Sequence, residues 1–435
     1  MKTSDPAAVL WRATAPAAAA TPALDGPCEA DVCIIGGGFT GLSTALHLAE
    51  GGARAVLLEA GDPGFGASGR NHGQVVPMLS RYGPEDTVAR FGYEAGERFN
   101  RFIAESAKLV FELIDRLGIE CDARPVGWLL PVDSPARDGM VRARADAWAA
   151  RGMPVRYLER AETEAMTGSR YWQGALHHAW GGNIQPLAYA RGLAKAALDA
   201  GAMVHAHSPA TALAQTGQRW HVKTPGGAVT ADQVVLATNG YTGRLWPGLG
   251  RAIVPFRLFL AATAPQGGNV RRHILPGDMS VSDSRTLLWP FRWDREGRMV
   301  TGGDIVLPWR ARGRAETVAR RRLQAAFPEL GDARFEFVWD GKVAMTLDRL
   351  PRAMELGPGV WTALGYNGRG VALATAMGRL LARRCLEGLK ADDPVPAALR
   401  QPHPVPFNRL AVPVARAMLL RYRQQDAKAA RSRAA

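Results

Sequence analysis

Four residues near the start of the chain have the types and the spacing that dinucleotide binding requires. Gly36, Gly38 and Gly41 form a G-x-G-x-x-G pattern. Glycines at this spacing permit a tight turn, close approach of the backbone to a pyrophosphate, and close packing of a helix on a strand. Glu59 lies 23 residues after Gly36, where a carboxylate accepts hydrogen bonds from ribose hydroxyls. The spacing predicts dinucleotide binding, but by itself it does not distinguish FAD from NAD.

The residues around this pattern predict the elements that position it. Residues 31–35 (DVCII) form an apolar run typical of a strand, and an amphipathic helix is expected from the turn to about Glu50. A second run, AVLLE, ends at Glu59. This order of about 30 residues matches a βαβ unit. Its parallel strands must lie in a covered sheet.

A second glycine turn, GYNGRG, lies far along the chain. Residues 361–382 combine an apolar run, three glycines (Gly365, Gly368 and Gly370) and a helical pattern. No acid follows at the end of a later strand, so a ribose has no partner there. We therefore expect the chain to return here to complete the first site. The N-terminus of a helix over residues 371–381 would then point at the ligand edge where negative charge develops.

Two features favour FAD over a nicotinamide cofactor. No second G-x-G-x-x-G follows a strand within residues 60–340, although an enzyme that takes hydride from NAD(P)H onto a flavin usually carries one. Electrons are therefore expected to come from the substrate itself. The segment GFGASGRNHGQVV, residues 64–76, is rich in small residues that let the backbone run close to a bulky ligand.

Several stretches together resemble a known family. They are DVCIIGGGFTGLSTALHLAEGGARAVLLEAG, GFGASGRNHGQ, GGNIQPLAYARGLAKAA, QVVLATNGYT, LDRLP and ALGYNGRGVALAT. The chain resembles the D-amino-acid-oxidase-like (DAO) superfamily of FAD-dependent oxidoreductases over roughly residues 10–420, and it is closest to the γ-glutamylputrescine oxidase branch. The resemblance implies an α/β fold, α+β overall. A Rossmann-like FAD-binding domain built from discontinuous segments would stand beside a substrate domain with a large antiparallel β-sheet.

The resemblance also implies a division of the chain into segments. An N-terminal segment would cover residues 1–27 and a basic C-terminal tail residues 396–435. The FAD-binding domain would comprise residues 28–80, 150–243 and 340–395. The substrate-binding domain would comprise residues 81–149 and 244–339.

The implied activity is oxidation of the C–N bond of an amine or amino acid. Hydride would pass from the carbon beside the amine to flavin N5, and the imine would then hydrolyse. The resemblance assigns the cofactor contacts position by position. In the first glycine motif and its strand they are Gly36, Gly38, Phe39, Thr40, Gly41 and Glu59. In the remaining motifs they are Ala67, Ser68, Gly73, Gln74, Ala237, Gly240, Gly365, Gly368, Arg369, Gly370 and Val371.

The sequence departs from the family pattern at two places. Sarcosine-oxidase-type relatives attach their flavin through a cysteine shortly before the last glycine motif, and the matching stretch WDGKVAMTLDRLP has none. Non-covalent FAD is therefore expected. Those relatives also carry an oxygen-activating lysine on a substrate-domain strand, which the comparable strand GRMVTGG lacks. A dehydrogenase that uses an acceptor other than O₂ stays open beside an oxidase.

Candidates for catalysis and substrate binding are fewer. Lys342 would supply a cation near the flavin or bind a substrate carboxylate, or it is an ordinary surface lysine. Arg292 would pair with a carboxylate, or it is ordinary and exposed. Tyr366, with Asn367, would line the pocket, whereas His72 is expected to be a structural histidine. Trp128, Trp289 and Trp293 could form an aromatic wall for an amine. Packing in the core is the expected alternative.

Composition limits the remaining possibilities. The net charge of +14 raises the alternative of a flavin module that acts on modified RNA, but no basic patch interleaved with aromatic residues supports a nucleic-acid partner. A flavoprotein that only scaffolds a partner is a further alternative. The start of the chain, which Arg12 and several prolines interrupt, is expected to be a loose segment. The basic tail is expected to be a solvated helix. No membrane span, no metal site and a cytoplasmic location are expected, and the oligomeric state is open.

Overall fold

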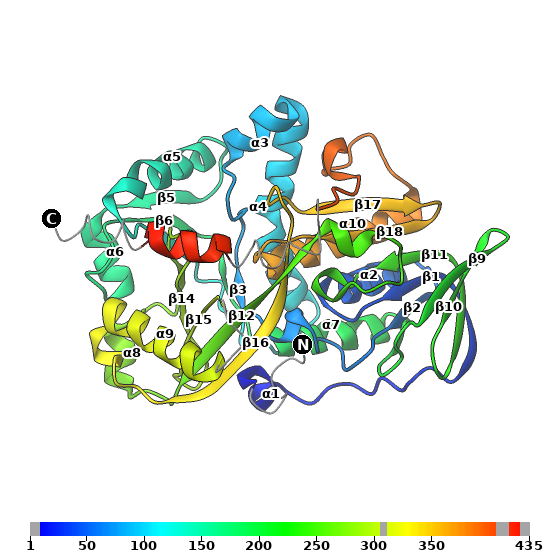
Figure 1. Cartoon of the computed structure of the whole chain (residues 1–435), viewed down its shortest axis with the longest axis horizontal. Coiled ribbons are helices and arrows are strands. Elements are labelled where there is room, and N and C mark those ends of the chain that lie inside the picture. Colours follow the sequence, from blue (N-terminus) through cyan, green and yellow to red (C-terminus); the bar gives the residue numbers. More distant parts are fainter. Residues whose placement is uncertain (1–8, 305–310, 406–416, 427–435) are drawn as a thin grey trace.

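The structure is a computed structural model that describes residues 9–304, 311–405 and 417–426. Two large β-sheets dominate it (Figure 1). The first lies at the right of Figure 1 and the second at the left, with two long strands of the second sheet running between them. The predicted α/β class, α+β overall, is confirmed.

The first sheet contains the predicted βαβ unit. Its strands in spatial order are β17 (Arg352–Gly357), β18 (Val360–Leu364), β11 (Gly227–Leu236), β1 (Gly26–Ile35), β2 (Ala55–Leu58) and β8 (Met203–His205). All neighbours are parallel except β17 with β18. A hairpin of β9 (Ala212–Thr216) and β10 (Arg219–Lys223) joins through β11. The chain thus returns to β1 through the distant strand β11, and β18 extends the sheet beyond β11.

Alternation along β1 explains how this sheet is covered. Val32 and Ile34 face a core shared with four helices, whereas Cys33 and Ile35 face a second core on the β9–β10 side. The helices of the first core are α2 (Phe39–Glu50), α4 (Tyr93–Arg116), α7 (Pro186–Asp199) and α10 (Gly370–Glu387). Both faces of the parallel strands are therefore buried, as the near-continuous apolar sequence of β2 requires.

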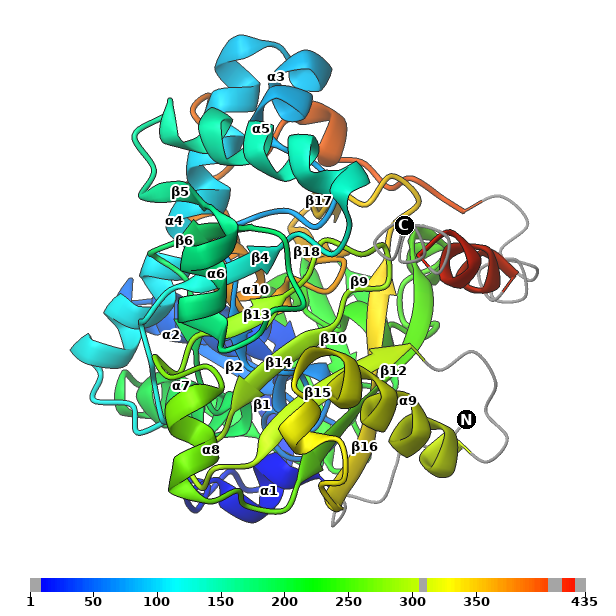
Figure 2. The same ribbon diagram turned by 90° about the vertical axis from the view of Figure 1, so that its left-hand side faces the viewer.

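The second sheet is largely antiparallel. Its order is β16 (Phe335–Met345), β12 (Val254–Thr263), β15 (Met299–Asp304), β14 (Pro290–Trp293), β13 (Ser280–Ser282), β4 (Trp128–Pro131), β6 (Ala175–His178) and β5 (Val155–Leu158). Only the β13–β4 pair is parallel. Figure 2, turned towards this part of the molecule, shows α9 (Ala311–Ala326) beside strands β12 and β16, with α8 (Gly268–His273) away from these two strands.

Sheet membership corrects the expected segment boundaries at three strands. β16 pairs with β12 along its length, so residues 340–345, which were expected in the FAD-binding segment 340–395, lie in the second sheet. β5 and β6 also join the second sheet, although they lie within the segment 150–243. The physical reason is pairing at long range, which the pattern of one strand does not encode. The other boundaries remain proposals.

The N-terminal segment is anchored, which corrects the expectation of a loose one. In α1 (Leu10–Thr14), Leu10 and Trp11 are buried, and the Trp11 indole N–H donates to the carbonyl of Asn71 at 2.7 Å. The Trp11 ring also meets the Trp339 ring edge to face at 5.9 Å. The first eight residues of the expected segment lie outside the described residues.

The remaining helices and strands lie outside the two large sheets. They are β3 (Gln74–Val75) paired with β7 (Gly182–Asn183), α3 (Pro84–Phe91), α5 (Asp138–Ala149), α6 (Arg160–Thr167) and a helix over residues 417–426. Within the described ranges, no helix is both long enough and apolar enough to cross a bilayer.

Candidate active site

A cavity of about 1440 Å³ is lined by residues from both sheets. The glycine turn after β1 and the segment after β2 line one part of it, and β12, β16 and the loop after β13 line another. It exceeds the usual volume of a small-ligand pocket, roughly 300–1,000 Å³. The cavity therefore has room for a large cofactor together with a substrate.

The first glycine motif has the close contacts that its spacing predicts. A Cβ on Gly41 would lie 1.9 Å from the Gly36 carbonyl oxygen, so the helix α2 can approach the turn only with glycine there. Gly36 has a φ of +113°. The N-cap residue of α2, Gly38, has no side chain to accept from the first turn of the helix, and Gly38, Phe39 and Thr40 line the cavity. Free N–H groups at such a helix end bind phosphate.

Glu59 stands where β2 ends, beside this turn. Its Oε2 accepts from the N–H of Gly37 at 2.6 Å and its Oε1 from the N–H of Gly61 at 2.8 Å. Burial raises the pKa of Glu59, while these two hydrogen bonds oppose the rise. The carboxylate is thus held in a fixed orientation on the cavity wall, and its remaining lone pairs can accept from ribose hydroxyls.

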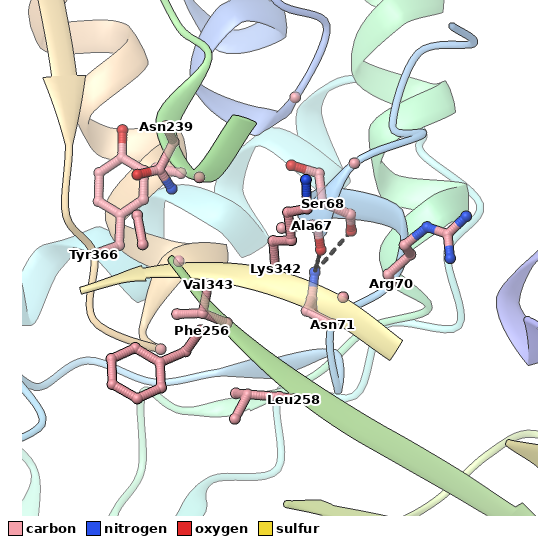
Figure 3. Close-up of a pocket in the computed structure, with 18 of the residues that line it drawn as sticks. Ala67, Ser68, Arg70, Asn71, Asn239, Phe256, Leu258, Lys342, Val343 and Tyr366 are labelled. Atoms are coloured by element: carbon pink, nitrogen blue, oxygen red, sulfur yellow. Dashed lines mark hydrogen bonds between the residues drawn. The ribbon is translucent and has the colours of Figure 1, made fainter. Parts of the chain in front are cut away.

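The small-residue segment crosses from the first sheet to the second. Figure 3 shows Ala67, Ser68 and Asn71 on one side of the cavity, with the Asn71 amide donating to the carbonyls of Ala67 and Ser68. The Ser68 hydroxyl accepts from the Phe39 N–H at 3.0 Å. Further along, the Gln74 amide donates to the Val281 carbonyl of β13 at 2.7 Å. The segment therefore connects the phosphate-binding turn to the second sheet.

The second glycine turn opens into the same cavity. Gly368, Gly370 and Val371 line it, and no side chain caps the N-terminus of α10. Helices α10 and α2 pack closely, since a Cβ on Gly378 would lie 2.5 Å from the Thr40 carbonyl oxygen. The Tyr366 hydroxyl joins Thr40 at 2.6 Å. The prediction that the chain returns to complete the first site agrees with this arrangement.

Three buried polar atoms on the cavity wall have no hydrogen-bond partner among the described residues. They are His72 Nδ1, Tyr241 Oη and Arg369 Nε. His72 donates from Nε2 to the Val300 carbonyl at 3.1 Å, and burial lowers its pKa to about 3, so the ring is neutral and Nδ1 is an acceptor. Buried polar groups in native proteins are nearly always paired. His72 Nδ1 and Tyr241 Oη, together with the N-termini of α2 and α10, fit a large polar cofactor such as FAD, whereas the Arg369 guanidinium lies beside Trp128 of β4.

Most of the residues predicted to hold the cofactor line this cavity. They are Gly36, Gly38, Phe39, Thr40, Glu59, Ala67, Ser68, Gln74, Ala237, Gly240, Gly368, Arg369, Gly370 and Val371. Gly41, Gly73 and Gly365 are not on its wall. Gly41 and Gly73 pack closely against backbone carbonyls instead, and Gly365 packs against the Thr346 side chain; Gly73 and Gly365 also have positive φ. Their contribution is to the shape of the turns.

Arg292 is the clearest correction among the predicted catalytic residues. It is absent from the cavity wall, 2% exposed, and donates to the carbonyls of Ile184 at 2.5 Å and Trp293 at 3.0 Å. Burial lowers its pKa to about 10. Its donors serve the main chain, so it is not available to a substrate carboxylate.

Lys342 and Tyr366 do line the cavity. Lys342 lies on β16 (Figure 3). Its Nζ is 5.0 Å from the centre of the Tyr241 ring. Its charge has no carboxylate within 4 Å in the part of the chain that the structure describes. Tyr366 is different, because burial raises its pKa and its hydroxyl is bonded to Thr40. Its hydroxyl thus links the second glycine turn to α2, and a catalytic role stays a prediction.

None of the three tryptophans lines the cavity. Trp128 and Trp293 are buried in separate apolar cores, and Trp289 stacks on Tyr171. Core packing, the simpler of the two expectations, describes them better than an aromatic wall.

Several cavity residues were missed from the sequence. Arg81, Arg144, Arg349 and Tyr422 line the cavity, although no motif includes them. The described part of the basic tail is also not a freely solvated helix. Its Asp426 carboxylate is 2.6 Å from the Arg137 guanidinium and accepts from the main-chain N–H groups of the cavity loop at 286 and 287. The rest of the tail, 406–416 and 427–435, lies outside the described residues.

Comparison with known proteins identifies a matching family and several relatives. Residues 31–384 match the family model described as "FAD dependent oxidoreductase" (DAO). The chain is 33% identical to the γ-glutamylputrescine oxidoreductase of Escherichia coli, covering 81% of this chain and 82% of that protein. It is 31% identical to a probable oxidoreductase, OrdL, of Haemophilus influenzae, over 84% of each.

Among solved structures, the glycine oxidase of Geobacillus kaustophilus superposes with a TM-score of 0.73 at 21% identity. The match covers 86% of this chain and 99% of that one. This likeness agrees with a Rossmann-like FAD domain beside a second sheet. The family resemblance expected from the sequence is confirmed, and the chain belongs to the DAO family of FAD-dependent oxidoreductases.

Proposed function

We propose that the protein oxidises the C–N bond of an amine or amino acid. The observation that carries this proposal is that the N-termini of two helices, α2 and α10, open into one cavity that strands of the second sheet also line. The named relatives, a γ-glutamylputrescine oxidoreductase and a glycine oxidase, act on substrates of this class according to their names.

The chain's own residues would bind and orient FAD and the substrate, and would stabilise the charge that develops during reduction. Bound FAD supplies the acceptor for the hydride that leaves the carbon beside the amine. Gly38, Phe39 and Thr40 would hold its pyrophosphate, and Glu59 its ribose. The N-terminus of α10, at Gly370 and Val371, would stabilise negative charge that develops during reduction. The second sheet would hold the substrate.

Non-covalent attachment of FAD is part of the proposal. The chain has four cysteines, and none of them lines the cavity. Burial raises the pKa of Cys33 and brings that of Cys121 to about 12, so these thiols are unreactive at neutral pH.

The decisive test is anaerobic reduction of the FAD-loaded protein by a panel of amines, N-methyl amino acids and amino acids. At least one class is expected to bleach the flavin absorbance. A panel that leaves the flavin oxidised throughout would contradict the proposal. Admitting air afterwards separates an oxidase, which regains its colour within a turnover, from a dehydrogenase that needs another acceptor.

Lys342 is proposed as the cation that assists reoxidation. Its side chain lies on the cavity wall with no carboxylate near it among the described residues. Its positive charge is therefore available to a ligand bound in the cavity. In the Lys342→Met variant we expect reoxidation by O₂ to slow by at least about tenfold, because a positioned charge at a developing anion contributes this much or more. Reduction by substrate is expected to change by less than about threefold on the same grounds.

Stopped-flow absorbance measures the two half-reactions separately. Lys390→Met is the matched control, since Lys390 is exposed and away from the cavity. Equal loss of both half-reactions in the Lys342 variant, or no loss of either, would argue against a role in reoxidation.

A further inference from the structure

Four arginines line one part of the cavity: Arg81, Arg144, Arg349 and Arg369. They come from distant segments. Arg81 precedes α3, Arg144 lies on α5, Arg349 follows β16, and Arg369 lies in the second glycine turn. They are nevertheless neighbours, because the Arg144 guanidinium donates to the Arg81 carbonyl at 3.0 Å. The charge of Arg144 also acts on Arg369, and that of Arg81 on Arg349.

No carboxylate neutralises these charges at short range. In the described part of the chain, none of the four guanidinium groups has a carboxylate oxygen within 4 Å, although 32 guanidinium–carboxylate pairs occur elsewhere among the described residues. Two other arginines on the cavity wall differ, because each is paired with a carboxylate. Arg137 is paired with Asp133 at 2.7 Å, and Arg285 is paired with Asp283. The cluster therefore presents uncompensated positive charge to the cavity.

The groups nearest to the four arginines offset their positive charge only weakly. Asp86 acts on Arg144 from beyond ion-pair distance, and its carboxylate accepts from the N–H of Gly83 at 2.7 Å. Tyr422, from the helix over residues 417–426, lies under the Arg81 guanidinium at 5.6 Å and hydrogen-bonds Arg349. An aromatic ring and a hydroxyl orient these two groups without removing their charge.

Arg369 is the strongest indication that an anionic ligand belongs here. It is only 8% exposed, its Nε has no partner among the described residues, and its guanidinium lies 5.0 Å from the centre of the Trp128 ring. Burial, with a smaller contribution from Arg144, lowers its pKa to about 10, so it is still charged at neutral pH. A buried charge without a partner is costly, and native proteins pair such groups.

The surroundings of Arg369 place its side chain on the substrate side. Trp128 belongs to β4 of the second sheet, and Arg144 belongs to α5, which packs on β5 and β6 of that sheet. Neither element contributes a residue predicted to bind FAD. The FAD phosphates are expected at the N-terminus of α2 instead. Arg369 was grouped with the cofactor residues from its motif, and its environment supports a different partner.

We propose that the substrate is an amine that carries at least two carboxylates, bound by Arg369 and Arg144 with Arg81 and Arg349 nearer the entrance. This inference rests on the proposed function and adds the substrate class to it. Guanidinium groups bind carboxylates through paired hydrogen bonds. A simple diamine would be repelled by four like charges, whereas a dicarboxylate compensates two of them. The exposed Arg81 would attract the anion before it enters.

The test uses glutarate, a dicarboxylate without an amine, as a probe of the FAD-loaded protein. Isothermal titration calorimetry at fixed ionic strength is expected to show one glutarate site, with butyrate and sulfate binding at least tenfold more weakly. Arg369→Gln and, separately, Arg144→Gln are each expected to weaken glutarate binding at least tenfold. Arg421→Gln, on the exposed face of the helix over residues 417–426 and away from the cavity wall, is expected to bind glutarate as the wild type does.

The outcomes are distinguishable. Absence of glutarate binding, equal affinity for sulfate, or unchanged affinity in both variants with normal FAD content would overturn the inference. The use of two variants keeps the test valid if one of them fails to fold. Should amines without carboxylates reduce the flavin while glutarate does not bind, the proposed function stands and this inference fails. Should glutarate bind as expected while no amine reduces the flavin, the anion site stands and the proposed function fails.

Discussion

The Gly36→Val variant is expected to lose FAD, with a dissociation constant at least 100-fold above that of the wild type. Gly36 has a φ of +113°, a conformation that a β-branched residue does not adopt without strain. A Cβ there would lie 2.9 Å from the Ala237 carbonyl oxygen. That carbonyl cannot withdraw, because the Ala237 N–H is bonded to Ile35 at 2.9 Å and β1 is paired with β11 along its length.

The strained backbone conformation and the close contact with Ala237 together displace the N–H groups that α2 presents at the phosphate-binding turn. Strain of this kind costs about 1–3 kcal/mol, and misplacing the helix N-terminus removes the site for the pyrophosphate as well. FAD content after purification and titration of the apoprotein with FAD measure the effect. Gly139→Val is the control, because Gly139 is exposed in α5 and a Cβ there meets nothing within 4 Å. A Gly36→Val protein that binds FAD normally would refute this placement of the pyrophosphate.

The Asp393→Ala variant is expected to lose about 3–5 kcal/mol of unfolding free energy, because it leaves a buried charge without its partner. The side chains of Arg384 and Asp393 are 1% and 0% exposed, and two hydrogen bonds of 2.8 Å join them. Asp393 also accepts from the Val395 N–H at 2.9 Å. This pair ties the C-terminal part of α10 to the segment that follows it.

Asp392→Ala is a closely matched control. Asp392 is the neighbouring residue and pairs with Arg383 at 3.4 Å, but its side chain is 74% exposed. Its loss is expected to cost less than about 1 kcal/mol. Urea denaturation followed by tryptophan fluorescence compares the two variants. Equal stability of both would show that burial does not control the strength of this pair.

FAD affinity is expected to be almost unchanged in the Asp393→Ala variant when it is measured below the unfolding transition. Arg384 lies 14 residues after Gly370 in α10, about 21 Å along the axis at 1.5 Å per residue. The damage is thus remote from the helix end that lines the cavity. The contrast with Gly36→Val, which acts on the cofactor directly, separates residues that hold the fold from residues that hold the ligand.

The sequence alone was sufficient to predict the features that depend only on residues close together in the chain. The spacing of Gly36, Gly38 and Gly41 predicted a strand, a turn and a helix, because each glycine satisfies a local steric condition. Glu59 was identified by its distance from that turn, since a βαβ unit places the end of its second strand beside the first. The family followed from the same motifs.

Only the tertiary structure decided where separate segments meet. β16 joined the second sheet because its partner β12 lies 80 residues earlier in the chain, and strand pairing at that distance leaves no local pattern. Arg292 became structural because it donates to main-chain carbonyls of two distant segments, those of His72 and Ile184. The arginine cluster comes from four segments, so its uncompensated charge becomes visible only when burial and the absence of nearby carboxylates are known for each side chain.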